Sequence, residues 1–527
     1  MFIDARTLAK DTQIDTDVCI VGAGAAGITI ARELIDKPFR VCLLESGGLG
    51  RHEDTQALYR GNIVGFPYYP LDLIRLRYFG GTTNHWTGAC RPLEEIDFET
   101  RPEIPHSGWP FPKSHLDPFY QRAHHLCQLG PYDYNPANWE TEENPCLSMV
   151  GNRVATAIHQ ESPPTRFGQV YREEIEQAQN ISTYLFANVV EIGTTAAADR
   201  VTRLSMATLQ GNHFSVTARF FILATGAIEN ARLLLVSNKV QNTGLGNQHD
   251  LVGRFFMEHL STPGGLLLPS LDLESCAGLY TTGGKFNGVR GVGYLMLTPE
   301  TLRREKLLNV RAFVRSASPQ ELARGTTGWS ISAQALIEAA RSRNLDIDFA
   351  GHLANVIRNT DEVAIYVYRK FFRRSKGIFF SLYYQLEHAP NSDSRVTLIP
   401  ERDQLGMPRV QLTWRFGDLE RRTLQRANEI IGQEFGRAGF GRVSAVHDDP
   451  NTGWPAGRRG SWHQMGTTRM HSDPQQGVVD EHGQVHSVAN LFIAGSSVFP
   501  TSGYMNPTLT IVALSIRLAD HVTQLMR

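Results

Sequence analysis

Largely apolar runs, each ending at a turn, recur near the start, in the middle and near the end of the chain. They comprise residues 18–21, 39–44, 220–224 and 490–494. Such runs are typical of parallel strands that are buried on both faces. Residues 28–34 and 228–235 follow two of the runs with helical patterns. This order of strand, turn and helix predicts an α/β layer of the Rossmann type, to which the C-terminal part of the chain returns.

A different pattern fills the middle of the chain. Residues 376–386, 395–398 and 410–414 predict short strands, and together they suggest an antiparallel sheet that forms the wall of a substrate cavity. Gln385 alternates with apolar neighbours and is predicted to face this cavity, although a polar strand residue often faces solvent instead. Residues 332–340 and 363–372 predict helices. We interpret the aromatic and basic run 368–374 as a helix with inward aromatics, and docking of a membrane or an electron-transfer partner as the alternative.

These patterns predict three segments in two joined domains. Residues 1–265 are expected to form the first part of a dinucleotide-binding domain, with residues 61–70 as part of a cavity lid. Residues 266–444 are expected to form an α+β substrate domain, and residues 445–527 to complete the first domain. A chain of 527 residues exceeds a single core, which agrees with two domains.

The first apolar run leads into a glycine motif. Gly22, Gly24 and Gly27 match GxGxxG, in which the glycines permit a tight turn, close approach to a pyrophosphate and close helix packing. The N–H groups of the helix that follows face the phosphates. Glu45 ends the next predicted strand, 18 residues after Gly27, where an acid accepts a hydrogen bond from a ribose hydroxyl. The segment therefore predicts a dinucleotide site.

Two residues near the C-terminus carry the candidate chemistry. His463 and Asn506 stand 43 residues apart. A neutral imidazole takes the proton of an alcohol at working pH, and a neighbouring amide holds the same oxygen by a hydrogen bond. Neither group accepts a hydride, so the pair predicts alcohol oxidation on the bound dinucleotide. Asn506-Pro507-Thr508 also predicts the start of a helix whose dipole favours negative charge near its N-terminus.

The other histidines receive a structural interpretation. His106, His259, His447 and His471 each stand beside turn-forming residues, and no pair has metal-ligand spacing. The six cysteines show no CxxC spacing. The sequence therefore predicts no metal site.

Composition narrows the class of protein. Hydrophobic residues make up 41% and charged residues 20%, and the net charge of −1 gives no footprint for nucleic acid. No apolar run approaches the ~18 residues that span a bilayer. The start lacks a basic segment followed by an apolar one. We expect a cytoplasmic enzyme that binds neither nucleic acid nor membrane, and an oligomer is compatible with the sequence.

Four blocks of the chain together resemble the glucose–methanol–choline (GMC) oxidoreductases, an FAD-dependent family. The blocks are residues 22–27 with Glu45, residues 80–88, residues 224–230 and residues 463–508. Within the family, Thr-Asn-His-Trp-Thr at residues 83–87 followed by His463 and Asn506 resembles the pyranose oxidase branch. The glycine-rich loop at 80–88 is expected along the isoalloxazine ring, too far from the first glycine loop to serve the same phosphates.

The resemblance implies a role for each matching residue. Thr87 is expected near flavin N5, and His85 matches the position where pyranose oxidases attach FAD covalently. Asn84 departs from the smaller hydroxyl residue that is common there, so a noncovalent His85 beside the ring is the alternative. The implied FAD contacts are Gly22, Gly24, Ala25, Ala26, Gly27, Glu45, Ser46, Gly81, Thr82, Asn84, His85, Trp86, Thr87, Val189, Ala224, Gly226, Gly495, Asn506, Pro507 and Thr508.

The resemblance also implies an activity. We expect oxidation of a secondary CH–OH group of a sugar or glycoside to a ketone, with His463 as general base and oxygen or another electron acceptor. One alternative is a dehydrogenase of another small alcohol or polyol that passes electrons to a quinone or a protein. A second alternative is a lyase that keeps FAD without net redox. A non-catalytic electron-transfer subunit is disfavoured because His463 and Asn506 are both present.

Overall fold

A six-stranded parallel sheet forms one layer of the protein. The computed structural model describes residues 1–269, 277–317, 379–444, 448–449, 453–455 and 457–527. Within them the sheet has the order β1-β8-β4-β3-β12-β24, and each neighbouring pair is parallel. Its strands are β1 (Phe2–Asp4), β3 (Val18–Val21), β4 (Val41–Leu44), β8 (Ile181–Leu185), β12 (Phe220–Leu223) and β24 (Leu491–Ile493). The predicted Rossmann-like layer is confirmed.

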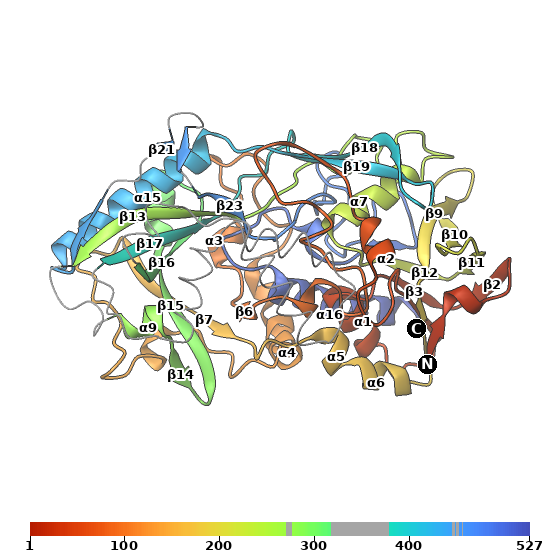
Figure 1. Cartoon of the computed structure of the whole chain (residues 1–527), viewed down its shortest axis with the longest axis horizontal. Coiled ribbons are helices and arrows are strands. Elements are labelled where there is room, and N and C mark those ends of the chain that lie inside the picture. The colour runs from red at the N-terminus through yellow and green to blue at the C-terminus, as the bar shows by residue number, and fades with distance from the viewer. Residues whose placement is uncertain (270–276, 318–378, 445–447, 450–452, 456) are drawn as a thin grey trace.

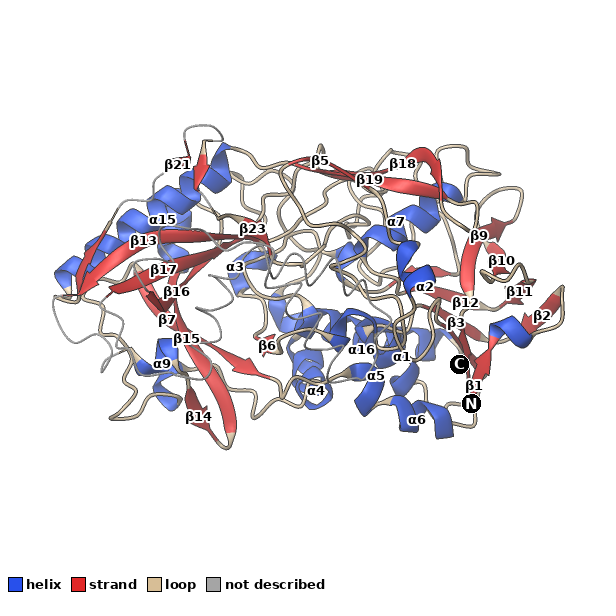
Figure 2. Ribbon diagram, in the orientation of Figure 1, coloured by secondary structure: helices blue, strands red, loops and turns tan. Residues whose placement is uncertain are grey.

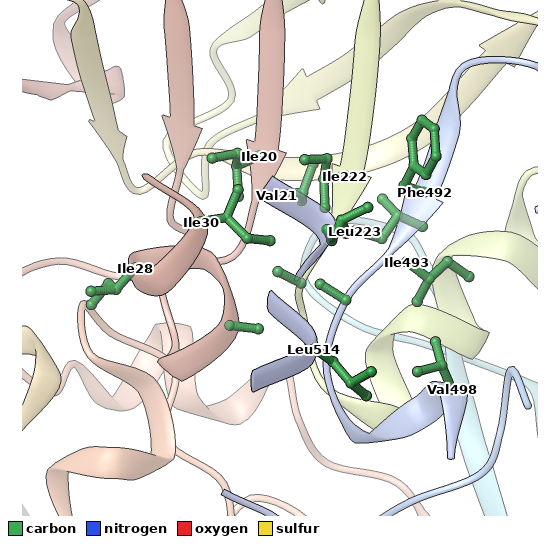
Figure 3. Packing of buried hydrophobic residues seen from close by; sticks show 14 of the residues in the cluster. Ile20, Val21, Ile28, Ile30, Ile222, Leu223, Phe492, Ile493, Val498 and Leu514 are labelled. Carbon is green, nitrogen blue, oxygen red and sulfur yellow. The ribbon is translucent and has the colours of Figure 1, made fainter. Parts of the chain in front are cut away.

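Helices cover this sheet and bury its apolar residues. Helix α1 (Ala25–Glu33) packs against α16 (Thr508–Leu525), and α7 (Ala227–Val236) follows β12. Figure 3 shows side chains of β3, β12 and β24 gathered with residues of α1 and α16. The strands β3 and β4 are buried at every position, which explains their uninterrupted apolar sequences. The N-terminal and C-terminal parts of the chain therefore share one core.

A nine-stranded sheet lies at the other end of the molecule (Figure 1). Its main order is β20-β13-β17-β16-β15-β7-β6, and each neighbouring pair is antiparallel. The long helix α15 (Asp418–Arg437) packs on it. The strands are β6 (Ala89–Cys90), β7 (Val154–Glu161), β13 (Leu260–Pro269), β14 (Gly284–Phe286), β15 (Val289–Leu297), β16 (Val310–Ala317), β17 (Phe379–Leu386), β20 (Gly441–Val443) and β23 (Arg459–Gly460).

The predicted antiparallel sheet is present, but its membership differs from the expectation. Strands β18 (Arg395–Arg402) and β19 (Pro408–Trp414) pair with β5 (Asn62–Gly65) in a separate sheet. Their buried side chains, Val396, Leu412 and Trp414, belong to the core of the parallel layer, which explains why they lie there. Strands β6 and β7 come from before residue 265, and β13 spans that position. The two layers thus draw on interleaved segments, and the predicted helices 332–340 and 363–372 and the run 368–374 lie outside the described residues.

The remaining elements are short and lie mostly around the two layers (Figure 2). A four-stranded sheet contains β2 (Thr12–Asp15), β9 (Asn188–Thr194), β10 (Val201–Ala207) and β11 (His213–Thr217), and a two-stranded sheet contains β21 (Asp448–Asp449) and β22 (Trp454–Pro455). The α-helices are α2 (Glu53–Ala57), α3 (Glu95–Phe98), α4 (Asp117–Leu126), α5 (Phe167–Val170), α6 (Arg172–Gln177), α9 (Gly278–Thr281) and α10 (Pro299–Glu305). The 3-10 helices are η1 (Ala5–Thr7), η2 (Gly81–Asn84), η3 (Lys113–His115), η4 (Pro136–Asn138) and η5 (Ser496–Val498). Within the described ranges, no helix combines the length and apolar character needed to cross a bilayer.

Candidate active site

A cavity of about 320 Å³ lies at the carboxyl edge of the parallel sheet. Residues from both ends of the chain line it, including the glycine turn after β3, the loop at 81–87, His463 and the start of α16. In open α/β sheets, ligands bind at this edge. Eighteen of the twenty residues implied as FAD contacts line this cavity, and His463 lines it too. The two implied contacts that do not line it are Gly27 and Asn84.

 Asn506, which is implied both as an FAD contact and as a catalytic residue, is one of these eighteen.

The glycine turn has the backbone that a dinucleotide requires. Gly22 has a φ of +101°, and a Cβ there would lie 2.6 Å from the carbonyl oxygen of Ala224. A Cβ on Gly27 would lie 1.8 Å from the oxygen of Gly22, so only glycine allows α1 to pack this closely. A Cβ on Gly24 would meet no protein atom within 4 Å, because this glycine faces the cavity at the N-terminus of α1. The turn therefore leaves room for a phosphate beside free N–H groups.

Glu45 closes the end of β4 beside this turn. Its carboxylate accepts hydrogen bonds from the backbone N–H groups of Ala23, at 3.0 Å, and Gly47, at 2.9 Å. Its side chain also lines the cavity. The Ser46 hydroxyl also donates to this carboxylate, at 3.3 Å. A carboxylate has about four acceptor positions, so three contacts leave capacity for a ribose hydroxyl. The placement agrees with the predicted role of Glu45.

The second glycine-rich loop contacts the first, contrary to the expectation that the two are far apart. The N–H of Gly80 donates to the carbonyl oxygen of Ala23 over 2.8 Å, and a Cβ on Gly81 would lie 3.0 Å from the Cα of Gly24. The two loops therefore form one continuous wall of the cavity. The amide of Asn84 instead donates to the oxygen of Phe79, within its own loop.

His85 lies further along the same wall. Its Nε2 is buried and has no hydrogen-bond partner among the described residues, although the ring lines the cavity. Burial lowers the pKa of His85 to about 4, so the ring is neutral at pH 7. A buried ring nitrogen without a partner fits contact with a bound group, and covalent attachment there stays a prediction.

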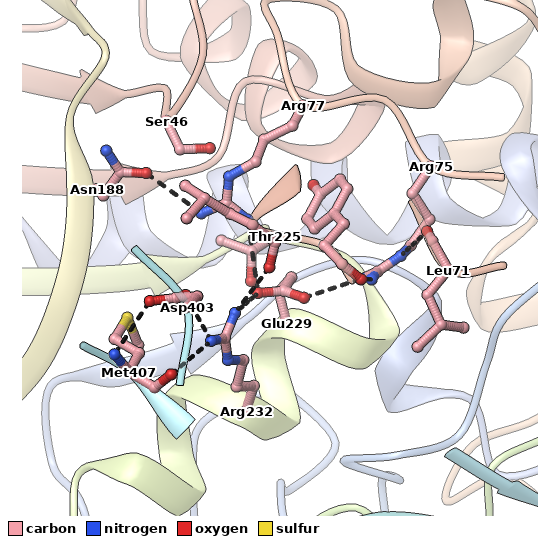
Figure 4. Close-up of polar contacts among 12 residues, drawn as sticks. Ser46, Leu71, Arg75, Arg77, Asn188, Thr225, Glu229, Arg232, Asp403 and Met407 are labelled. Atoms are coloured by element: carbon pink, nitrogen blue, oxygen red, sulfur yellow. Dashed lines mark hydrogen bonds and ion pairs between the residues drawn. The ribbon is translucent and has the colours of Figure 1, made fainter. Parts of the chain in front are cut away.

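An ion-pair network lines the cavity near the glycine turn (Figure 4). Glu229 accepts from Arg75 at 2.9 Å and from Arg232 at 3.3 Å, and Arg232 also donates to Asp403 at 2.7 Å. Burial raises the pKa of Glu229, but the three guanidinium groups of Arg232, Arg75 and Arg77 outweigh it and lower this pKa to about 2. The network fixes the loop at 71–77 against α7.

Glu258 holds the backbone of the predicted base in place. Its buried carboxylate accepts from the N–H of His463 at 2.8 Å and from the N–H of Ser461 at 3.1 Å, and Tyr68 donates to it through its hydroxyl. Trp462, between the two donors, has a φ of +65°, which is rare for a bulky residue. The carboxylate therefore holds a strained turn that presents His463 to the cavity.

The side chains of His463 and Asn506 lie on the same cavity, as predicted. His463 Nδ1 lies 2.9 Å from Nδ1 of His259, and the Oδ1 of Asn506 accepts from Arg311 at 2.8 Å. His463 Nε2 and Asn506 Nδ2 form no hydrogen bond with any residue that the structure describes. Burial, His259 and Arg311 lower the pKa of His463 well below 6.5, so the imidazole is neutral and able to accept a proton.

Gln385, predicted to face the substrate, does not line this cavity. Only 5% of it is exposed, and its amide contacts Arg311 and His259 behind the wall. Its register explains the position, because Gln385 pairs with Arg311 on β16 and with Ser261 on β13.

His259 and Arg311 are the functional neighbours that sequence reasoning missed. His259 is fully buried, and its ring contacts His463, a contact that its flanking residues do not indicate. Arg311 is 2% exposed within an apolar strand. The signal in the sequence was an arginine inside an apolar strand, since arginine is seldom buried unless its charge is paired.

Comparisons with known proteins agree with this geometry. A family model described as FAD dependent oxidoreductase matches residues 17–244, and one described as GMC oxidoreductase matches residues 390–515. A 2-methyl-1,2-propanediol dehydrogenase of Mycolicibacterium austroafricanum is 23% identical over 97% of this chain and 95% of its own length. A C-glycoside 3-oxidase of Microbacterium trichothecenolyticum is 37% identical over 23% of this chain and 22% of its own. The crystal structure of pyridoxine 4-oxidase from Mesorbium loti shares the fold, with a TM-score of 0.56, 17% identity and coverage of 96% and 98%.

The two family models cover the two parts of the chain that meet at the cavity. The first contains the glycine turn, Glu45 and His85, and the second contains His463 and Asn506. The open space before Gly24 and the unpartnered nitrogen of His85 fit FAD. The chain therefore belongs to the GMC oxidoreductases, a family of FAD-dependent enzymes that act on alcohols.

Proposed function

We propose that the chain oxidises a secondary CH–OH group of a sugar or glycoside to a ketone. The observation that carries this proposal is the joint placement of His463 and Asn506 on the wall of one cavity. Each of them has a side-chain nitrogen that forms no hydrogen bond with a described residue. The name of the C-glycoside 3-oxidase relative supports a glycoside substrate. The assignment to the pyranose oxidase branch rests on the same residues and stays a prediction.

The two residues have complementary tasks on one substrate oxygen. A neutral His463 accepts the hydroxyl proton at Nε2, which makes the alcohol a better hydride donor. Asn506 donates from Nδ2 to the same oxygen and holds it as negative charge develops. When bound, FAD supplies the acceptor for the hydride that leaves the carbon.

The cofactor would be held along the whole cavity. The N–H groups at the start of α1 and the carboxylate of Glu45 would hold its pyrophosphate and ribose. The loop at 81–87 and the residues at the start of α16 would enclose its ring.

A second candidate is oxidation of a small alcohol or polyol, with electrons passed to a quinone or a protein. The name of the 2-methyl-1,2-propanediol dehydrogenase relative favours it, because that protein matches this chain over nearly its whole length. Oxygen as the acceptor belongs to the first candidate, and a lyase without net redox is the third. A cytoplasmic location stays a prediction from the sequence.

Anaerobic mixing of the FAD-loaded protein with substrates distinguishes the candidates. We expect monosaccharides or glycosides to bleach the flavin absorbance, and simple diols to bleach it slowly. Faster bleaching by simple diols would favour the second candidate. If substrate is consumed and the flavin stays oxidised, the lyase is correct instead. Readmission of oxygen to the bleached enzyme then shows whether oxygen serves as the acceptor.

A further inference from the structure

A buried chain of hydrogen bonds lies behind the two catalytic candidates. It begins at Arg311, whose guanidinium contains only donors. Arg311 Nη2 lies 2.6 Å from Gln385 Oε1 and 2.8 Å from Asn506 Oδ1. Both amides therefore turn their oxygens towards Arg311 and their N–H groups away from it. For Asn506, this orientation leaves Nδ2 as the donor for a substrate.

The orientation of Gln385 determines the proton position on His259. Gln385 Nε2 lies 3.0 Å from Nδ1 of His259, so this nitrogen is an acceptor. The other nitrogen of His259, Nε2, lies 2.9 Å from the carbonyl oxygen of Gly503, which only accepts. Both contacts place the single proton of neutral His259 on Nε2.

The same argument continues to His463. Its Nδ1 lies 2.9 Å from the Nδ1 of His259, and a hydrogen bond between two nitrogens needs one proton. Because His259 Nδ1 is an acceptor, the proton belongs to His463 Nδ1. The lone pair of His463 is then on Nε2. We propose that His259 is a positioning residue that fixes His463 in its Nδ1–H tautomer, a conclusion that rests on the proposed function of His463 as base.

The surroundings keep both rings neutral. Burial lowers the pKa of His259 to about 3, and Arg311 adds to this effect. A protonated His259 would turn an N–H towards the N–H of His463 and break the contact. Glu258 accepts from the backbone N–H groups of both histidines, at 2.9 Å for His259, and so fixes the distance between them. The tautomer therefore depends on a hydrogen-bond pattern rather than on a nearby charge.

Two substitutions of His259 each keep one of its two hydrogen-bonding groups, either the acceptor for His463 or the donor to Gly503. In His259→Asn, the amide oxygen occupies about the position of Nδ1, so His463 keeps its acceptor. In His259→Gln, the amide nitrogen occupies about the position of Nε2, so Gly503 keeps its donor and His463 loses its acceptor. We expect the rate of flavin reduction to stay within ~10-fold of wild type for Asn and to fall by at least ~10²-fold for Gln, the lower range for a general base. If His259 served only to hold Gly503, His259→Gln would be the more active of the two variants, because it keeps the donor to Gly503.

The tautomer itself is measured by NMR of protein with ¹⁵N-labelled histidine rings. Signals that disappear in His463→Gln identify His463. We expect a protonated Nδ1 and an unprotonated Nε2 in wild type and His259→Asn, and a shift towards the Nε2–H form in His259→Gln. An Nε2–H tautomer in the wild type would overturn the proposal even if neither variant folds. Normal activity of His463→Ala would instead reject the proposed function, independently of the tautomer.

Discussion

Arg311 Nη2 lies 2.8 Å from Oδ1 of Asn506, yet no carboxylate in the described part of the chain forms an ion pair with this guanidinium. Burial lowers the pKa of Arg311 to about 10, so the group keeps its charge at pH 7. The rings of Phe313 and Tyr294 face it at 4.7 and 5.5 Å and partly compensate for the lost hydration. The site thus holds a buried cation next to the residue that is expected to bind the reacting oxygen.

Arg311→Lys tests whether the forked geometry of Arg311 matters beyond its charge. A lysine ammonium is compact and matches two acceptors less well than a guanidinium. We expect FAD to be retained and flavin reduction to slow by about 10- to 100-fold, since misplaced groups cost this much. Stopped-flow absorbance measures the rate, with Arg315→Lys on the same strand as the control. An unchanged rate would mean that the charge alone is sufficient.

His463→Ala is expected to retain FAD and to lose at least ~10²-fold in flavin reduction, because a general base contributes ~10²–10⁴-fold. Asn506→Ala should also slow reduction, through loss of the donor to the reacting oxygen. The two losses should not add in the double variant, because both residues act on one oxygen in one transition state. Anaerobic stopped-flow measurements on the three variants, at matched flavin content, check this. A near wild-type rate for His463→Ala would remove it as the base.

Gly24→Val is expected to abolish FAD binding without unfolding the protein. The Cβ position at Gly24 is free of protein atoms, so a side chain there intrudes on the cofactor alone. The flavin absorbance of the purified variant and its circular dichroism provide the two measurements. Gly27→Ala is the matched control, because its Cβ would clash with Gly22 and reduce stability itself. Full yellow colour in Gly24→Val would place the cofactor elsewhere.

Acid precipitation tests whether His85 attaches FAD covalently or only contacts it. Flavin that remains with the pellet of the wild type and enters the supernatant for His85→Ala would support the attachment. The partnerless Nε2 of His85 on the cavity wall motivates this test. Complete release of flavin from the wild-type protein would end the covalent hypothesis and favour a ring that only contacts the cofactor.

Glu229→Gln is expected to lower the free energy of unfolding at pH 7 by about 3–4 kcal/mol. This value follows from the fall in the pKa of Glu229 from 4.5 to about 2, at about 1.4 kcal/mol per pKa unit. Because the folded pKa is the lower one, the stabilisation is complete above pH 4.5 and is lost as the pH falls towards 2. Urea unfolding of the FAD-loaded proteins at pH 7 and pH 3 should show the difference shrink to less than half. A difference that does not depend on pH would point to packing instead.

Local constraints made part of this structure predictable. At Gly22 and Gly27, a Cβ atom would clash with nearby backbone atoms, so the turn requires glycine. The GxGxxG motif shows this requirement directly in the sequence. Burial on both faces of β3 and β4 follows from their apolar sequences. The contact of His259 with His463 was not predicted, because His463 stands 204 residues later in the chain. The residues that flank His259 in the sequence do not indicate a contact over such a separation.

Pairing between strands limited the prediction of the substrate layer in a similar way. The strand containing Gln385 was predicted, but the alternation of its side chains does not say which neighbour each one meets. Its partners Arg311 and Ser261 come from two other strands. Strands β18 and β19 were likewise predicted, and only their pairing with β5 shows that they cover the parallel layer.

The last strand to be synthesised, β24, pairs with β12, and α16 then packs on α1. During translation, the edge of β12 and one apolar side of α1 therefore have no partner until residues 491–525 emerge from the ribosome. An exposed strand edge invites pairing with other chains. The cavity wall that includes Gly495 and Asn506 is likewise incomplete until these residues have been synthesised.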